Sequence, residues 1–254
     1  MEFYLGIEAI LSFFDERADG SEGHAAALNA VMGEELAEVL LCRCIVESFG
    51  GKARVLTECE SPITPKLGTL RGNRLDRWIL SDTDTPDVDR ILYQVEIKNW
   101  NAHSYGGRPL SVRASDEEVK RHRMRLWRDN WSEEERRFVE EEANKVLLRM
   151  EPPAYCDDET GKVAPLPAIA KERIMPLISF WFPVHPEGLG EALFFKPFPA
   201  GPINGFPGVW VFSMSNYLRT KMVSGTDKIA VRMPVMARRI EWLNRMFSST
   251  PLSE

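Results

Sequence analysis

The chain has 254 residues, of which 44% are hydrophobic and 28% charged, and its formal net charge is −6. This length and composition predict one globular domain with a large core. The net negative charge disfavours a non-specific nucleic-acid coat protein, but it does not exclude a nuclease, because local basic patches govern contacts with phosphate.

Four cysteines are present, and no two of them form a CxxC pair. This predicts neither a disulfide framework nor a zinc site, and it favours a reducing, cytoplasmic setting. The apolar N-terminal stretch is interrupted by acids and lacks a basic leader, which disfavours a signal peptide. No run approaches the roughly 20 apolar residues that span a bilayer, so we expect no membrane partner.

The first third of the chain predicts two helices and a strand. Residues 2–16 place Phe3, Ile7, Ile10, Leu11 and Phe14 on one helical face. A second helix is expected over about 24–49; it is apolar almost all round from Leu36 onward, and two glycines follow it. Residues 52–60 alternate loosely and predict a strand.

The stretch 74–100 contains two short apolar runs that each carry charges in the middle. In the second run Glu96 and Lys98 are two residues apart, so they face one way while Ile91, Tyr93, Val95 and Ile97 face the other. If the first run pairs beside it, Asp76 brings a second carboxylate to the same edge. Converging carboxylates resist ionisation unless a cation lies between them, which indicates a divalent-metal site.

The rest of the chain alternates helices, strands and loops. A helix is expected to start at Ser115 and to lead into a basic stretch containing Lys120, Arg121, Arg123 and Arg125. Another is expected over 132–150, followed by an exposed excursion over 151–167. Strands are predicted at 174–184, 192–195 and 209–214, and a last helix at 235–247.

The order helix, three strands, helix, strand carries Glu38 in its first helix, Asp76 in its second strand and Glu96-Ile97-Lys98 in its third. This arrangement resembles the PD-(D/E)XK nuclease superfamily, with the restriction-endonuclease-like fold, over about residues 33–184. The resemblance implies a single α/β domain, 1–254, with a central mixed β-sheet flanked by helices. Segments 2–16 and 209–247 would be additions to it.

The resemblance implies that Asp76, Glu96 and the backbone carbonyl of Ile97 bind Mg²⁺ or Mn²⁺, with Glu38 joining directly or through water. Lys98 would orient the attacking water or neutralise the phosphate. The implied activity is metal-dependent phosphodiester hydrolysis, with DNA as the expected partner, in restriction, defence or repair. Gln94 and the basic residues Lys120, Arg121, Arg123 and Arg125 are candidate substrate contacts.

Two departures from the family pattern keep alternatives open. Leu75, not proline, precedes Asp76, and nineteen residues separate Asp76 from Glu96, so Asp87 or Asp89 of the intervening loop is an alternative ligand. Glu96 and Lys98 also fit a surface cross-strand pair, and Gln94 and the basic stretch fit solvated surfaces. A catalytically inactive binding subunit, an RNA substrate or a non-nucleic-acid substrate, and a homodimer are further open readings.

Overall fold

A computed structural model gives a mixed α/β fold built on a central mixed sheet. The described residues are 2–18, 34–58, 77–82, 91–98, 111, 113–121, 154–156, 163–165, 173–181, 190–198, 201–202 and 206–247. The strand order across the sheet is β6-β5-β2-β3-β4-β7-β9-β8. Its strands are β2 Lys52–Glu58, β3 Arg77–Asp82, β4 Ile91–Lys98, β5 Ala154–Cys156, β6 Val163–Pro165, β7 Ile174–Phe180, β8 Leu193–Pro197 and β9 Gly208–Ser213.

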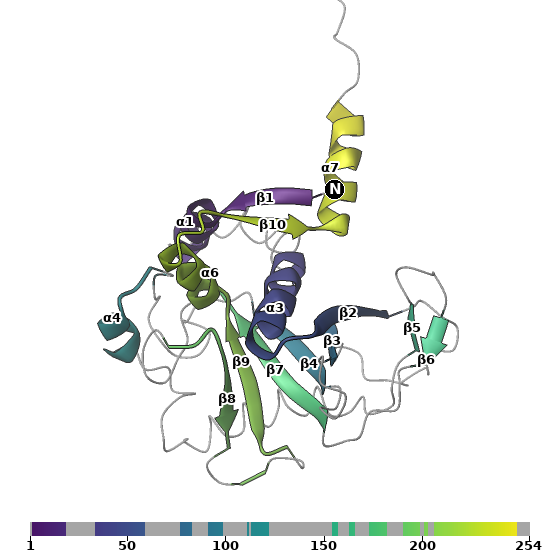
Figure 1. Ribbon diagram of the computed structural model, residues 1–254. Coiled ribbons are helices and arrows are strands. Elements are labelled where there is room, and N and C mark those ends of the chain that lie inside the picture. The colour runs from purple at the N-terminus through teal and green to yellow at the C-terminus, as the bar shows by residue number, and fades with distance from the viewer. Residues whose placement is uncertain are drawn as a thin grey trace, which may run out of the picture.

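Strand directions divide the sheet into two halves (Figure 1). The strands β2, β3 and β4 form an antiparallel meander, and β5 and β6 extend it beyond β2. The strand β7 then runs parallel to β4, and β9 runs parallel to β7. Parallel neighbours need a long connection, and the chain between β4 and β7 includes α4 and the two strands β5 and β6 at the far edge of the same sheet. The predicted central mixed sheet is confirmed.

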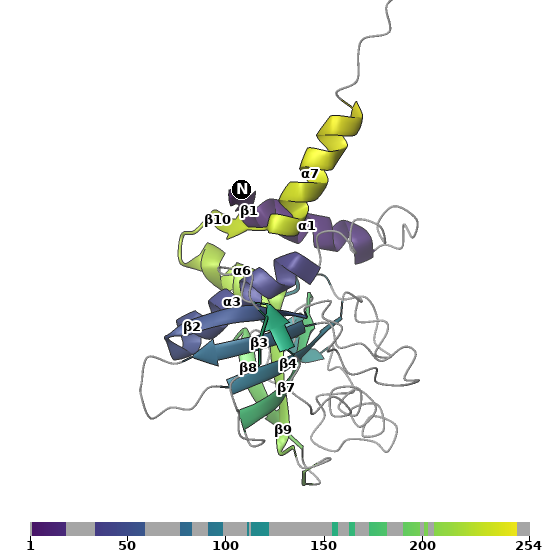
Figure 2. The ribbon, with the colours of Figure 1, turned by 90° about the vertical axis from the view of Figure 1, so that its right-hand side faces the viewer.

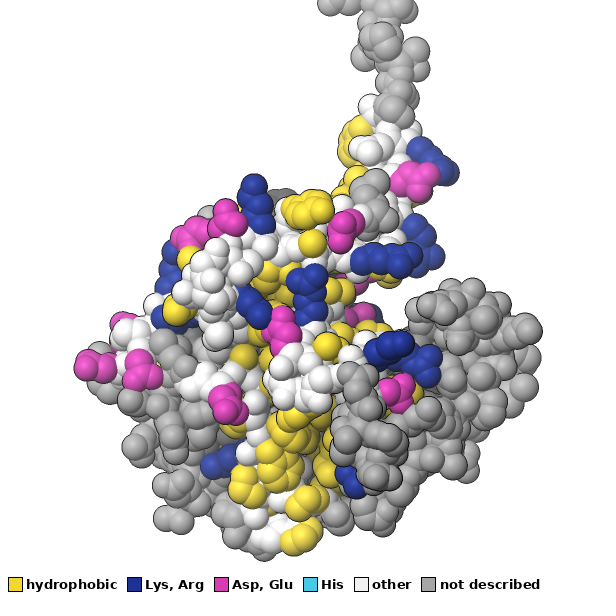
Figure 3. Space-filling view, viewed as in Figure 1, with side chains coloured by type: hydrophobic (Ala, Val, Ile, Leu, Met, Phe, Trp, Pro, Cys, Tyr) yellow, Lys and Arg dark blue, Asp and Glu magenta, His cyan; other side chains and the backbone are white. Residues whose placement is uncertain are grey.

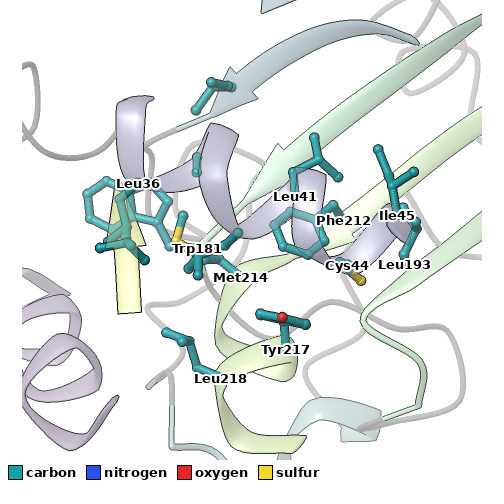
Figure 4. Packing of buried hydrophobic residues seen from close by; sticks show 14 of the residues in the cluster. Leu36, Leu41, Cys44, Ile45, Trp181, Leu193, Phe212, Met214, Tyr217 and Leu218 are labelled. Atoms are coloured by element: carbon teal, nitrogen blue, oxygen red, sulfur yellow. The ribbon is translucent and has the colours of Figure 1, made fainter. Parts of the chain in front are cut away.

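The helix α3 Glu34–Phe49 covers one face of the sheet. Its buried side chains include Leu36, Leu40, Leu41 and Ile45, which join the core cluster together with residues of β3, β4, β7 and β9 (Figure 4). Each fully buried side chain of this size contributes about 1.5–3 kcal/mol by leaving water. The helix ends at Phe49 because Gly50, at φ 77°, adopts a left-handed conformation that other residues rarely accept.

A second layer covers α3 on the side away from the sheet (Figure 2). It contains α1 Ile7–Ala18, α6 Met214–Val223 and a two-stranded ribbon of β1 Glu2–Gly6 with β10 Lys228–Arg232. The ribbon turns Phe3, Leu5, Ile229 and Val231 toward the core cluster. The last helix, α7 Pro234–Phe247, points away from this layer.

The predicted helix over 2–16 is wrong in its first five residues. Phe3 and Leu5 are less exposed than Glu2 and Tyr4, which is the alternation of a strand, and β1 pairs with β10 from Glu2 opposite Arg232 onward. A partner more than two hundred residues away supplies these backbone hydrogen bonds, so local periodicity did not reveal it. The helix begins at Ile7, as its own pattern requires.

Other predicted elements agree with the structure where they are described. The strands expected near 52, 174, 192 and 209 and the helix expected near 235 are present. At α4 Asp116–Arg121 the expected capping box is confirmed: Ser115 Oγ accepts from Glu118 N at 3.2 Å, and Ser115 N donates to Glu118 Oε2 at 2.7 Å. Residues 24–33 of the second predicted helix and the whole of 132–150 lie outside the described residues.

Besides β1, three strands and one helix were not expected where they occur. The excursion predicted at 151–167 contains β5 and β6, and α6 and β10 occupy a segment that the sequence analysis left unassigned. The strand β9, predicted within an added C-terminal segment, pairs with β7 inside the central sheet. No helix among the described residues is long and apolar enough to cross a membrane.

Candidate metal centre

Strand β4 lies in the interior of the sheet, between β3 and β7, and its two faces differ in chemistry. Tyr93 and Val95 are fully buried and Ile97 is nearly so; all three belong to the core cluster beneath α3. Strand alternation assigns Gln94, Glu96 and Lys98 to the opposite face. Burial does not distinguish the two rows, because Leu92 and Gln94 of the second row are as deeply buried as Tyr93 and Val95 of the first, so the functional role of the second row remains a prediction.

Gln94 begins the polar row and is 0% exposed. Within the described part of the chain, neither its Nε2 nor its Oε1 has a hydrogen-bond partner. In the ladders Gln94 lies opposite Trp78 on β3 and beside Pro176 on β7. Burying an amide without partners costs about 1–3 kcal/mol. The interpretation of Gln94 as a solvated strand residue is therefore wrong, because packing of the sheet excludes it from solvent, and its role as a substrate contact remains a prediction.

Glu96 and Lys98 follow on the same strand. Their backbones pair in register with Ile178 and Phe180 of β7. Their side chains lie outside the described residues, as do Asp76 and the alternative acids Asp87 and Asp89. Within the part of the chain that the structure describes, no three metal-ligating side chains come together. The proposed ligand set of Asp76 and Glu96 thus remains a prediction.

Ile97 fits its expected place between the two charged residues. Its side chain is 8% exposed and packs in the core cluster, and its backbone pairs with Ser179 of β7. Its carbonyl as a metal ligand remains a prediction.

Glu38 makes an interaction that the sequence analysis did not anticipate. Arg77, the first residue of β3, donates from Nε to Glu38 Oε1 and from Nη2 to Glu34 Oε2, the latter at 3.1 Å. One guanidinium therefore ties two carboxylates of α3 to the start of β3. The Glu38 side chain is only 12% exposed, and the Arg77 side chain is 33% exposed.

Burial dominates the electrostatics of Glu38. It raises the pKa of this carboxyl from 4.5 to about 7, while the charge and hydrogen bond of Arg77 act in the opposite direction. Glu35 and Glu34 raise it further through like-charge repulsion. Glu38 is thus the one predicted site residue whose described environment holds a proton near neutral pH.

The position of Glu38 gives it a partner that the sequence did not predict, while its role as a metal ligand remains a prediction. Arg77 pairs with Val95, so it lies on the α3 face of the sheet, and Glu38 meets it there. Glu96 and Lys98 belong to the opposite row of β4. Among the described residues, the contact of Glu38 is with Arg77 on the α3 face of the sheet.

The predicted substrate contacts are only partly placed. Lys120 and Arg121 end the short helix α4, and their side chains are outside the described part, as are Arg123 and Arg125 entirely. The functionally suggestive residue that sequence reasoning missed is Arg77. A signal existed, because Glu34 and Glu38 share a helical face at i, i+4 and need a cation to offset their repulsion.

No protein-family model, curated protein or solved structure was found to match this chain.

Proposed function

We propose that this chain is a divalent-metal-dependent nuclease with a restriction-endonuclease-like core, and that it hydrolyses phosphodiester bonds in DNA. The observation that carries the proposal is the arrangement of the described elements. The order α3, β2, β3, β4, β7 gives a helix, an antiparallel meander and then a strand parallel to the third. The helix, the three strands and the later strand follow the order that the resemblance implies, with α4 and the additional strands β5 and β6 between β4 and β7, and with Glu96-Ile97-Lys98 at the end of the third strand.

The register of β3 and β4 supports the pairing of the two carboxylates. Arg77 lies opposite Val95. In sequence, Asp76 precedes Arg77 and Glu96 follows Val95, so one further step of the same antiparallel ladder would set Asp76 beside Glu96. Two carboxylates on neighbouring strands are a hard-oxygen donor set of the kind that suits Mg²⁺ or Mn²⁺.

Each residue of the set has a proposed task. Asp76 and Glu96 would hold the cation, with the Ile97 carbonyl as a third oxygen. A cation held there supplies charge stabilisation at the scissile phosphate and lowers the pKa of a bound water. Lys98 would direct the attacking water and offset charge on the phosphate.

Glu38 fits this proposal as a positioning residue. Its ion pair with Arg77 fixes the first described residue of β3, which is the neighbour of Asp76 in sequence. Because Glu34 shares the same guanidinium, α3 restrains the strand end through two carboxylates. We therefore place Glu38 behind Asp76, acting through the backbone that Arg77 anchors.

The test is cleavage of single- and double-stranded DNA and of RNA, with Mg²⁺, with Mn²⁺ and with chelator. We expect metal-dependent cleavage of DNA, and a loss of at least about a thousandfold in Lys98→Ala and Asp76→Ala. Asp87→Ala and Asp89→Ala are matched controls, because they remove the competing acids of the loop. Undiminished cleavage in Lys98→Ala would show the assignment to be wrong, and DNA binding without cleavage under any metal condition would favour a binding subunit.

A further inference from the structure

The helix α7 exposes an apolar face that no described part of the chain covers. Its exposed large side chains lie in its second half: Trp242 at 61%, Leu243 at 43%, Met246 at 51% and Phe247 at 79%. None of its residues is buried, and the helix projects from the body in both ribbon views (Figures 1 and 2). A contiguous apolar face of this kind typically marks an interaction surface.

The base of α7 is held firmly, so the helix has a fixed direction. Glu35 of α3 is buried, and its carboxylate accepts from the backbone N–H groups of Val235 at 2.8 Å and Met236 at 2.9 Å. A carboxylate on the first free N–H groups of a helix satisfies donors that the helix itself leaves unpaired and matches its dipole. The preceding strand β10 is paired with β1. We call α7 the arm.

A groove lies at the other end of α3, and we call it the aromatic groove. It has a volume of about 530 Å³ and is bordered by the end of α3, by α6 and by β8 and β9. The rings of Phe49 and Phe195 each lie 5.5 Å from the ring of Trp210, and these two phenylalanines are 43% and 36% exposed. Figure 3 shows hydrophobic side chains gathered on this face, below α3.

The charges of the arm and of the groove are complementary. The arm carries Arg238, Arg239 and Arg245 against a single Glu241. The groove is lined by Glu47 and Glu191 against a single Lys221, whose Nζ lies 2.7 Å from Glu47 Oε2. Complementary charge at the rim of an apolar contact favours the correct partner and register more than it adds raw affinity.

The helix α3 separates the base of the arm from the groove of the same chain. Glu35 and Phe49 are fourteen positions apart on this helix, which corresponds to about 21 Å. The arm also points away from the groove in both ribbon views. A groove that receives the arm therefore belongs to another molecule.

We propose that the arm of one chain docks in the aromatic groove of a second copy of this chain. The arm of the second copy docks in the aromatic groove of the first in the same way. The exposed ring and aliphatic side chains of the arm leave water against Phe49, Phe195 and Trp210, while the arm's arginines approach Glu47 and Glu191. Two such contacts related by a two-fold axis close the assembly as a dimer. This inference does not depend on the proposed nuclease activity.

The test is the mass of the full chain in solution, measured by light scattering coupled to size exclusion and by sedimentation velocity across micromolar to submillimolar concentrations. The wild-type chain should reach twice the mass of the 254-residue monomer. The arm variant Leu243→Asp with Phe247→Asp should be monomeric, as should the groove variants Phe195→Asp and Phe49→Asp, which change different elements. Val223→Asp is the matched control, because this side chain is 91% exposed on α6 and does not line the groove.

Mixing the arm variant with a groove variant distinguishes this contact from others. The mixture retains one intact arm and one intact groove, so we expect a heterodimer that dissociates at higher concentration than the wild-type dimer. Far-ultraviolet circular dichroism checks that each variant is folded. The proposal would be overturned if the wild type were monomeric or if the mixture stayed monomeric. It would also be overturned if both groove variants, Phe195→Asp and Phe49→Asp, stayed dimeric, which would indicate arm-to-arm pairing.

Discussion

Both faces of the central sheet bury apolar side chains, but along β4 only the row that faces away from α3 continues from an apolar residue, Leu92, into Gln94, Glu96 and Lys98. On the α3 face, Tyr93, Val95 and Ile97 join one continuous apolar cluster. On the other face, Gln94 is buried among apolar neighbours with both amide atoms unpartnered, and Glu96 and Lys98 follow it. Packing explains the first row. It does not explain the second, because apolar residues would serve stability better there.

This contrast leads us to expect that the row facing α3 serves mainly stability and that the opposite row of β4 serves mainly function. The α3 face should respond to substitution through the free energy of unfolding. Substitutions in the opposite row of β4 should change the cleavage activity, and replacing its buried polar side chain by an apolar one should raise the free energy of unfolding. The following predictions test this separation, from the largest expected effect to the smallest.

Leu40→Ala should give the largest loss of stability. This side chain is fully buried on α3, so its truncation removes apolar contact and leaves a cavity. We expect the free energy of unfolding to fall by about 3 kcal/mol in urea titrations. Leu243→Ala on the exposed arm, measured at low protein concentration, is the matched control and should change it by less than about 0.5 kcal/mol. Equal effects at the two sites would contradict the assigned core.

Glu38→Gln should change how stability depends on pH. The folded-state pKa of Glu38, about 7, lies above the ordinary value of 4.5, chiefly because of burial. The contribution of its protonated form is therefore fully present below about pH 4.5 and is lost as the pH rises to about 7. Across this window the wild type should lose about 3 kcal/mol relative to the variant. Urea titrations at successive pH values measure this difference, and a constant difference would contradict the shifted pKa.

Glu35→Ala should weaken the base of the arm. It leaves the N–H groups of Val235 and Met236 without their acceptor, so we expect a loss of about 1–2 kcal/mol and faster hydrogen exchange at these two amides. Glu35→Gln retains one carbonyl-type acceptor and should recover part of the loss. Unchanged exchange in Glu35→Ala would show that other contacts fix the direction of α7.

Gln94→Leu should have the smallest effect on stability and the opposite sign. Replacing an unpartnered buried amide by an apolar side chain of similar size should raise the free energy of unfolding by about 1 kcal/mol. If the polar row serves catalysis, the same variant should lose cleavage activity while it gains stability. A destabilised variant with full activity would indicate that Gln94 belongs to the packed structure.

Much of the local structure could be predicted from the sequence. The apolar pattern of α3 and the glycines behind it defined that helix and its end, and Ser115 with Glu118 defined the start of α4. The spacing of Glu96 and Lys98 assigned them to one face of a strand, and Tyr93, Val95 and Ile97 of the alternate row pack in the core cluster. These features follow from interactions between residues close in sequence.

The rest required the tertiary structure because it depends on partners that are distant in sequence. The spacing of apolar residues over 2–16 predicted a helix, but β1 is a strand because β10 pairs with it. Glu38 had the pattern of a metal ligand, and only the register of β3 revealed Arg77 beside it. A helical period likewise predicted an amphipathic α7, but only the position of its base on Glu35 decided that its apolar face would project away from the core.

The sequence alone thus determined which residues share a face, since side-chain direction follows from the period of a helix or strand. It determined the E-x-K row of β4 and the acids available to it. The tertiary structure decided which face is covered, which charges meet and which polar groups are left without partners. Burial and pairing are properties of whole surfaces in contact, and no local pattern specifies the surface on the other side.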